Sequence, residues 1–470
     1  MQLSVPIHSY QHRSRPASTA RLVNCYPELL PQDAKTPVLL TRSPGIASWT
    51  TVGTGSIAGM LPALNKLYTV SGSSLYETDS NKVSTLLGSV GSPGNIDMAA
   101  NGSAVVVVNE PNAFYWDGST FGQITDADFT SRGAGDVEFL DNFMLFREPD
   151  SDRFFGADLG TVTDFDALQF ANSDANPDIL NGMKVDHRQV VLASANSMEI
   201  FQNTGASGFP IERAINGYVE QGCLNGRTLQ KQDQTVFWLA DDYTVRKLSG
   251  LTPVRVSTHA IEQAIGQRTI ATASAFTYSQ YGHLFYVLNF SDGTFVYDAT
   301  ADTWHERLTY GDDSWKIKHH AQAFGLELVG DSQSNKIGYL DADTYSEFGD
   351  LQRMEWTYQP VYAEGRRAFH SRLEVVLETG VGLVTGQGSD PQLMMDYSDD
   401  GGLTWNSLPN RSIGGIGERY VRCIWNALGS STQRVYRGAI SDPVKVTITD
   451  TPNVQYMTLR APSRSERWPP

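Results

Sequence analysis

Short apolar runs separated by polar turns make up most of the chain. The runs are rich in Val, Thr, Tyr, Phe and Trp, and clusters of Gly, Asp, Asn and Ser divide them, a pattern typical of β-structure. The best helical pattern covers residues 258–267, where Ala260, Ile261, Ala264 and Ile265 fit one helical face. The pattern therefore predicts an all-β fold with one short helix.

A repeated unit is the most informative feature of the pattern. Each copy consists of an apolar strand, a polar turn and a strand with aromatic residues, and most neighbouring copies start roughly 40 to 50 residues apart. The copies are Asn65–Asp79, Ala104–Gly118, Asp136–Leu159, His187–Gly205, Gln234–Gly250, Gly282–Asp298 and Leu326–Asp341. One small sheet cannot bury both of its faces, whereas a ring of such sheets can. We therefore predict a β-propeller of six or seven blades; a β-sandwich with a similar number of strands is the alternative.

A change in the sequence pattern after Asp350 indicates a second domain. A new series of strands begins near Met354 and continues to about residue 450, which predicts a C-terminal β-sandwich. The expected organisation is an N-terminal arm with the first strands at 1–50 and a propeller at 51–350. A sandwich at 351–450 and a loosely held tail at 451–470 complete it.

Composition and charge exclude several classes of protein. The chain has 470 residues, a hydrophobic content of 40% and a net charge of −16, from 52 acidic and 36 basic residues. Such an acidic chain is not typical of a nucleic-acid binder, and no apolar run is long enough to span a membrane. Cys25, Cys223 and Cys423 lack the spacing of metal ligands or of a disulfide framework. The first residues also lack the apolar stretch of a secretory signal.

A small basic arm stands out at the N-terminus. Arg13, Arg15 and Arg21 fall within the first 21 residues, which contain no acid. A solvated terminus is the simpler interpretation. The arm is nevertheless a candidate for docking on a neighbouring protein.

The sharpest local motif is an Asp-box, S-x-D-x-G-x-T-W, formed by Ser398, Asp400, Gly402, Thr404 and Trp405. Its chemistry is turn chemistry: the Asp accepts backbone N–H bonds, the Gly takes a positive φ and the Trp packs under the hairpin. Asp-boxes occur in sialidases, but they are structural there and recur in several blades. A single copy in the C-terminal segment predicts a hairpin stabiliser.

Candidate catalytic groups are weak throughout. The acid pairs Asp241-Asp242, Asp312-Asp313 and Asp399-Asp400 could in principle serve glycoside cleavage. Each pair falls in a predicted turn, where Asp is favoured for its side-chain-to-backbone hydrogen bonds. His319-His320 has no ligand partner at a metal-binding spacing. We expect no enzyme activity, no cofactor and no metal.

Several segments resemble a known family of phage proteins. RLVNCYPELLPQ (Arg21–Gln32) followed by LLTRSPGI (Leu39–Ile46) is similar to the start of the packaged-DNA stabilisation family. LYTVSGSSLYE, NSMEIFQNTG and EQGCLNGRTLQKQDQTVFWLADDYTVRKLSG continue the resemblance in order, over most of residues 20–340. That family supplies tail hub or nozzle proteins to short-tailed bacteriophages, and the C-terminal region matches it less clearly.

The resemblance implies a structural role in the virion tail, after synthesis in the host cytoplasm. Identical copies, six in most such tails, would form a ring that extends the channel of the portal and adaptor proteins. The ring would retain packaged DNA and conduct it on ejection without sequence-specific binding, and tail needle, spike or fibre proteins would dock on its far end. The acidic surplus would line part of the lumen, and the Arg-bearing arm would dock on the adaptor. Two other hypotheses are a propeller that binds or cleaves host-surface glycans and a soluble propeller adaptor with peptide partners.

Overall fold

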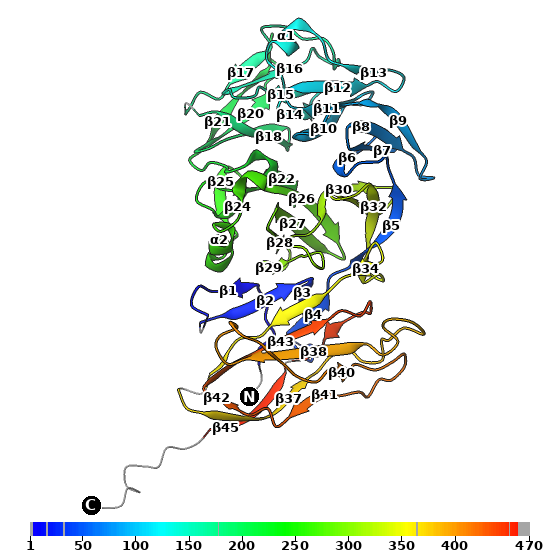
Figure 1. Ribbon diagram of the computed structural model, residues 1–470. Helices are drawn as coiled ribbons and strands as arrows, with labels where there is room; N and C mark the ends of the chain where they lie inside the picture. The colour runs from blue at the N-terminus through cyan, green and yellow to red at the C-terminus, as the bar shows by residue number, and fades with distance from the viewer. Residues whose placement is uncertain are drawn as a thin grey trace, which may run out of the picture.

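The computed structural model describes residues 3–15, 17–31, 33–176, 178–362, 365–450 and 452–458. Figure 1 shows an elongated molecule with a propeller at one end and a sandwich at the other. Helical structure in the described residues comprises α1 (Ala127–Thr130), α2 (His259–Ile265) and the single turns η1 (Gly226–Thr228) and η2 (Ile270–Thr272). Helix α2 confirms the predicted short helix, although it begins after Thr258 and ends before Gly266.

Seven sets of four antiparallel strands, within the residues that the structure describes, form the blades of the propeller; five of the sets are separate sheets, and the last two are parts of larger sheets. The first three blades use consecutive strands: β6 (Ile57–Ala63), β7 (Lys66–Ser71), β8 (Ser74–Thr78) and β9 (Ser84–Ser89); β10 (Ile96–Ala100), β11 (Val105–Asn109), β12 (Asn112–Trp116) and β13 (Phe121–Gln123); β14 (Asp136–Leu140), β15 (Phe143–Arg147), β16 (Arg153–Gly156) and β17 (Phe170–Asn172).

The remaining blades follow the same order around the ring. They are β18 (Leu180–Asp186), β19 (Gln189–Ser194), β20 (Met198–Asn203) and β21 (Ile211–Val219); β22 (Gln230–Gln232), β23 (Thr235–Leu239), β24 (Val245–Ser249) and β25 (Thr252–Arg255); β26 (Ser274–Gln280), β27 (His283–Phe290), β28 (Gly293–Asp298) and β29 (Thr303–Glu306); β30 (Ile317–Ala323), β31 (Leu326–Asp331), β32 (Lys336–Asp341) and β5 (Gly45–Thr51).

The repeat predicted from the sequence corresponds to the blades. Each repeated unit contains the second and third strands of one blade, as Asn65–Asp79 contains β7 and β8. These middle strands are the most buried; in β11, for example, every Val side chain is inaccessible to solvent. Blades pack face to face through apolar side chains, so each sheet buries both faces, as the prediction of a propeller required.

Closure of the ring depends on a strand from the N-terminal part of the chain. Strand β5 pairs antiparallel with β32, with Ile46 opposite Leu340, and completes the last blade. The predicted boundary assigned residues 1–50 to an N-terminal arm with the first strands. In the structure, β5 belongs to the propeller, although most of its residues lie before that boundary. Its partner lies at the other end of the domain sequence, so no local pattern reveals the pairing.

The C-terminal domain is a β-sandwich, as predicted. One layer contains β35 (Met354–Thr357), β36 (Val361–Tyr362), β38 (Gln392–Ser398), β39 (Asn406–Ser407), β40 (Arg411–Ser412) and β43 (Gln433–Ile440). The other contains β37 (Ala368–Val375), β41 (Cys423–Asn426), β42 (Ser430–Ser431) and β45 (Asn453–Thr458). A small sheet of β3 (Cys25–Leu29), β4 (Val38–Arg42) and β44 (Thr447–Ile448) lies alongside. The short pair β33 (Ser346–Glu347) and β34 (Asp350–Leu351) joins the last blade.

The sandwich also extends into the predicted tail. Strand β45 pairs along β37, with Val454 opposite Leu373, and the Val454 side chain is fully buried in the sandwich core. The tail predicted at 451–470 is therefore shortened, because its first part contributes an edge strand with an inward-facing Val. The rest of that prediction, residue 451 and residues 459–470, lies outside the described residues.

Strand β2 (Thr19–Val23) joins the two domains into one continuous sheet. It pairs in parallel with β29 of the sixth blade and antiparallel with β35 of the sandwich. Strand β1 (Tyr10–Gln11) pairs with β2 from outside that path. The arrangement is visible in Figure 1, where the blue N-terminal strands lie between the two domains.

Candidate functional site

A buried arginine lies at the joint between propeller and sandwich. Arg42, at the end of β4, has only 2% of its surface exposed. One guanidinium nitrogen, Nη1, donates to the carbonyl oxygens of Asp442 and Val444 of the sandwich, the latter at 3.1 Å. The other, Nη2, donates to the carbonyl oxygens of Tyr345, at 3.3 Å, and of Gln352. Arg42 thus binds the chain leaving the propeller and a loop of the sandwich together.

The electrostatics of Arg42 fit a structural role. Burial lowers the pKa of this guanidinium to about 10, so it stays charged at neutral pH. A buried charge is tolerated only when it is hydrogen-bonded, and here backbone carbonyls supply the acceptors. Sequence reasoning missed this residue, because LLTRSPGI offers no sign that its Arg is buried.

The N-terminal segment fastens a second point of the joint. The Arg21 Nε donates to both carboxylate oxygens of Glu306 at 3.1 Å, and the Arg21 Nη2 donates to Oε2 at 2.8 Å. The Ser9 hydroxyl donates to the other side of that carboxylate at 2.9 Å, and the Ser9 N–H donates to the carbonyl of Trp304. The Glu306 carboxylate raises the pKa of Arg21. Farther along, Leu3 and Val5 are buried in the core of the sandwich.

The Asp-box residues form a hydrogen-bonded turn after β38. Asp400 accepts the N–H groups of Leu403 and Thr404 at 2.9 Å and the hydroxyls of Ser398 and Thr404 at 2.6 Å. These hydroxyl hydrogen bonds hold the pKa of the Asp400 carboxyl below its usual range. All of these bonds connect residues at most four positions apart, so the geometry is that of a turn and not of a substrate pocket.

Gly402 and Trp405 complete this turn. Gly402 has a φ of +86°, and a Cβ atom there would lie 3.2 Å from the Trp405 ring. The half-buried ring stacks against the Arg437 guanidinium, whose carbon lies 4.2 Å from the ring centroid. From the N-terminal segment, Arg15 Nη1 donates to the Gly402 carbonyl at 2.8 Å. The Asp-box and the basic arm, predicted as separate features, therefore meet.

The three arginines of the arm consequently have different surroundings. Arg15 and Arg21 bind groups of their own chain, whereas Arg13 is exposed. Of this set only Arg13 therefore has a side chain available to a neighbour in the described structure. The partners Glu306 and Gly402 lie hundreds of positions away, so no sequence signal points to them.

The acid pairs do not assemble into a catalytic site. Asp399 forms a bidentate pair with Arg434, at 2.6 and 2.8 Å, and Asp242 binds Arg246 and the backbone N–H of Thr244. His320 pairs with Glu327 at 2.6 Å. The described residues contain no cluster of three or more His, Cys, Asp or Glu side chains able to hold a metal ion. They also contain no helix with the length and apolar character to cross a bilayer.

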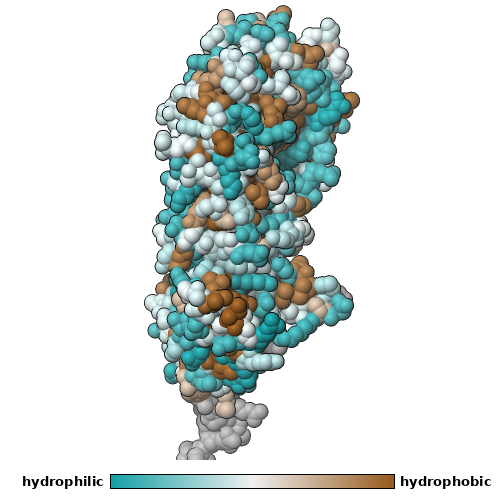
Figure 2. Space-filling model, turned by 90° about the vertical axis from the view of Figure 1, so that its right-hand side faces the viewer, coloured by the Kyte–Doolittle hydropathy of each residue, from teal (hydrophilic) through white to brown (hydrophobic). Residues whose placement is uncertain are grey.

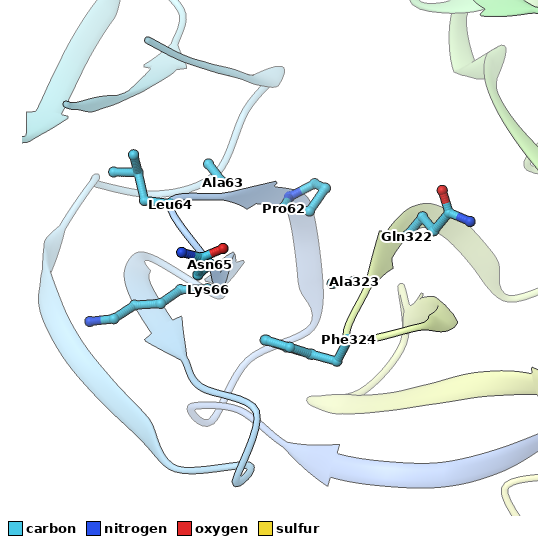
Figure 3. Close-up of a pocket in the computed structure, with 8 residues that line it drawn as sticks. All are labelled: Pro62, Ala63, Leu64, Asn65, Lys66, Gln322, Ala323 and Phe324. Carbon is cyan, nitrogen blue, oxygen red and sulfur yellow. The ribbon is translucent and has the colours of Figure 1, made fainter. Parts of the chain in front are cut away.

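A pocket of about 400 Å³ lies between the first and last blades, at their first turns (Figure 3). It is lined by Pro62, Ala63, Leu64, Asn65, Lys66, Gln322, Ala323 and Phe324. The Phe324 ring stacks on Trp49 at 5.7 Å between centroids, and Lys66 is paired with Glu77 at 2.5 Å. No carboxylate lines this pocket, so it lacks the two acids that glycoside cleavage requires.

Comparison with known proteins identifies both domains. Residues 5–345 match the family model described as bacteriophage P22 Gp10, beta-propeller. Residues 354–452 match the family model described as bacteriophage P22 Gp10, beta-sandwich. The two matches follow the order of the domains in the structure. No curated protein matches the chain.

Solved structures are similar to this chain at low sequence identity. The computationally designed Ika8 protein aligns with 63% of this chain and 99% of its own, at 15% identity and a TM-score of 0.40. PorZ, from the type-IX secretion system of Porphyromonas gingivalis, aligns with 69% of this chain and 44% of its own, at 9% identity and a TM-score of 0.39. The N-terminal domain of Nup159 aligns with 68% of this chain and 99% of its own, at 11% identity and a TM-score of 0.39.

Proposed function

This chain belongs to the bacteriophage P22 Gp10 family, which makes it a structural protein of a phage tail, and from that premise we propose that it builds a ring below the portal and adaptor. Identical copies close the ring through heterologous interfaces, in which each copy presents two different surfaces to its two neighbours. The ring, a hexamer on the family precedent, extends the channel, retains packaged DNA and conducts it on ejection.

The observation that supports this proposal best is the set of strand pairings and buried hydrogen bonds across the joint. A continuous sheet passes from the sixth blade through β2 into the sandwich, and Arg42 binds carbonyls on both sides of the same junction. A hinged adaptor that moves its domains would need a junction with few buried contacts. A tube that holds DNA under pressure needs its two domains to move as one body.

The distribution of charge supports a role beside DNA. Residues 110–178 contain fifteen Asp or Glu side chains and three Arg, a formal charge of −12 out of −16 for the whole chain. This segment comprises the third blade and its flanks, at the end of the molecule farthest from the sandwich (Figure 1). If this end borders the lumen, it repels the duplex and limits sticking, within a screening distance of about 8 Å at physiological salt.

Contacts with neighbouring copies and proteins involve exposed groups of the sandwich and of the N-terminal segment. Large apolar side chains are exposed on loops of the sandwich: Leu383, Val384, Leu403, Ile416 and Tyr420. Figure 2 shows brown, hydrophobic patches on the sandwich end of the face that it presents. We assign Arg13 of the N-terminal segment to docking on the adaptor, and tail needle, spike or fibre proteins to the opposite end of the ring.

DNA retention provides the direct test of this function. Capsids filled with DNA and carrying portal and adaptor, but lacking this protein, are incubated with the purified chain and then treated with nuclease. The proposal expects the protected fraction of DNA to rise with added protein until the ring is complete. An unchanged protected fraction, with the protein bound, would refute retention. Release of sugars from host-surface glycans by the purified chain would favour the glycan-cleaving alternative.

A further inference from the structure

The ring of blades closes at a seam that contains an open pocket. The first and last blades meet there, and the pocket of about 400 Å³ lies between the β6–β7 hairpin turn and the β30–β31 hairpin turn (Figure 3). We call this space the seam pocket. Its volume falls within the range of about 300–1,000 Å³ that is usual for small-molecule sites.

Elsewhere in the propeller, neighbouring blades are tied together at or beside the corresponding turns. Arg188 Nη2, in the turn of the fourth blade, binds Asp141 Oδ2 in the turn of the third blade at 2.8 Å. Lys231 Nζ of the fifth blade binds Asp186 Oδ1 of the fourth blade at 3.0 Å. Among the described residues, no hydrogen bond or ion pair joins the turns of the first and last blades, and the seam pocket occupies the space between them.

Both turns at the seam hold a bulky residue in a backbone conformation that favours Gly and Asn. Leu64 has a φ of +48°, and Phe324 has a φ of +54°. Each loop has two residues, both with positive φ, as in a type I′ turn. A Leu or Phe in that position is strained, whereas Asn or Gly is not. Strain of this kind is typical of functional sites, and here the two strained residues both line the seam pocket.

An aromatic ring stands in the seam pocket in a fixed position. In Figure 3 the Phe324 side chain extends from its turn into the space between the two hairpins. Trp49, with 7% of its surface exposed, stacks against the Phe324 ring at 5.7 Å between centroids and at an interplanar angle of 20°. The Phe324 ring is half-buried, and its remaining surface lines the pocket. The ring therefore offers a flat apolar platform to a ligand.

Two carboxamide side chains border this platform. The Asn65 carboxamide has no hydrogen-bond partner among the described residues, and Gln322 uses one N–H, which donates to Glu327 Oε1 at 3.0 Å. Lys66 is the one charged residue in the lining, and it is paired with Glu77 at 2.5 Å. The seam pocket therefore presents neutral hydrogen-bonding groups and no uncompensated charge.

A neutral sugar matches both the aromatic platform and the carboxamides. One face of a pyranose ring consists of C–H groups that pack on an aromatic ring, while its hydroxyls exchange hydrogen bonds with carboxamides. A purely apolar ligand would displace water from the carboxamides without replacing its hydrogen bonds, and a charged ligand would find no counter-charge. We propose that the seam pocket binds a neutral pyranose unit of a glycan, with Phe324 as the stacking platform and Asn65 as a hydrogen-bond partner. This is binding without cleavage, and it goes beyond the structural role proposed above.

Titration of the full chain with the methyl glycosides of glucose, galactose, mannose and N-acetylglucosamine tests this site. Saturation-transfer difference NMR and isothermal calorimetry measure binding, and wild-type protein should bind at least one of these sugars. F324N removes the ring and should weaken that binding about tenfold or more, while Asn before Gly is the pair that this turn prefers, so the hairpin stays formed. N65G keeps the turn, because Gly takes a positive φ freely, and should weaken binding about threefold to tenfold through the lost carboxamide.

Y281N is the matched control for these variants. Tyr281 has the same turn position in the sixth blade, with a φ of +51°, but it does not line the seam pocket. Y281N should therefore bind sugar like wild type, and the melting temperature of each variant checks that it is folded. No binding of any of these sugars by wild type, or equal binding by wild type, F324N and N65G, would overturn the proposal. Binding of N-acetyl-leucinamide in place of the sugars, also lost in F324N, would overturn it as well and assign the pocket to an apolar side chain of a partner protein.

Discussion

Replacing Arg42 by Met should loosen the joint between propeller and sandwich. Met has similar length and fills similar space, so the substitution removes the guanidinium without opening a large cavity. The carbonyl groups of Val444, Tyr345 and Gln352 lose the hydrogen-bond donor that Arg42 gives them, and none has another donor among the described residues. The Asp442 carbonyl keeps the N–H of Val444.

The magnitude follows from these three carbonyls. A buried acceptor left without a donor costs about 1–3 kcal/mol, so the two buried carbonyls, of Val444 and Gln352, would cost roughly 2–6 kcal/mol, and the partly buried Tyr345 carbonyl adds less. Removing the guanidinium also ends the cost of keeping a charge away from water, which offsets part of this loss. We therefore expect R42M to reduce the free energy of unfolding by about 2–4 kcal/mol. R42K, whose ammonium group can reach some of the carbonyls, should lose about half as much.

Urea unfolding followed by tryptophan fluorescence and by circular dichroism measures this change. Wild-type protein should unfold with both signals changing together, whereas R42M should unfold at a lower urea concentration and with the sandwich separating from the propeller. R13M, which alters an exposed arginine, should stay within about 0.5 kcal/mol of wild type. A loss of less than about 1 kcal/mol in R42M would refute the role that we give to this residue.

Further predictions concern the N-terminal segment, the Asp-box and pH. R21M leaves the Glu306 carboxylate without its main partner and should reduce the free energy of unfolding by about 1–2 kcal/mol in a urea titration. This loss is smaller than that expected for breaking a fully buried ion pair, because Arg21 is partly exposed. An unchanged urea midpoint would refute the stabilising role of this contact. G402A should reduce the free energy of unfolding by about 1–2 kcal/mol, because φ there is +86° and the new Cβ meets the Trp405 ring. G102A, at an open position outside the left-handed region, should leave the stability unchanged. Equal melting temperatures of the two variants would contradict the account. Burial lowers the pKa of His305 to about 3, so below about pH 6.5 the unfolded chain binds a proton that the folded chain does not. Stability from this group is thus present above pH 6.5 and falls by about 2 kcal/mol by pH 5, and H305Q should show a flatter pH dependence in that window; parallel curves would contradict it.

Local chemistry explains what could be predicted from the sequence. The strand pairs β7–β8 and β11–β12 could be predicted, because the alternation of apolar and polar residues and the turn residues between them are patterns within a few positions of the sequence. The strands of the C-terminal sandwich could be predicted for the same reason. The turn around Asp400 likewise depends on residue types at fixed offsets within one hairpin.

Long-range pairing explains what could not. Strand β5 closes the ring by pairing with β32, and β2 joins the domains by pairing with β35. The sequences of β5 and β2 do not indicate these distant partners. Arg42 follows LLT at the end of an ordinary strand, and only the folded chain surrounds it with four carbonyls. Arg15 and Arg21 looked like a free basic arm because Gly402 and Glu306 come next to them only in three dimensions.

The mass of a portal–adaptor complex, before and after incubation with this protein, tests the central claim most directly. Sedimentation velocity or native mass spectrometry gives the gain in units of the 51.7 kDa chain. The account predicts one discrete gain corresponding to a closed ring of identical copies, with no stable partial rings at saturation. A complex whose mass stays unchanged, or grows without limit as protein is added, would contradict it.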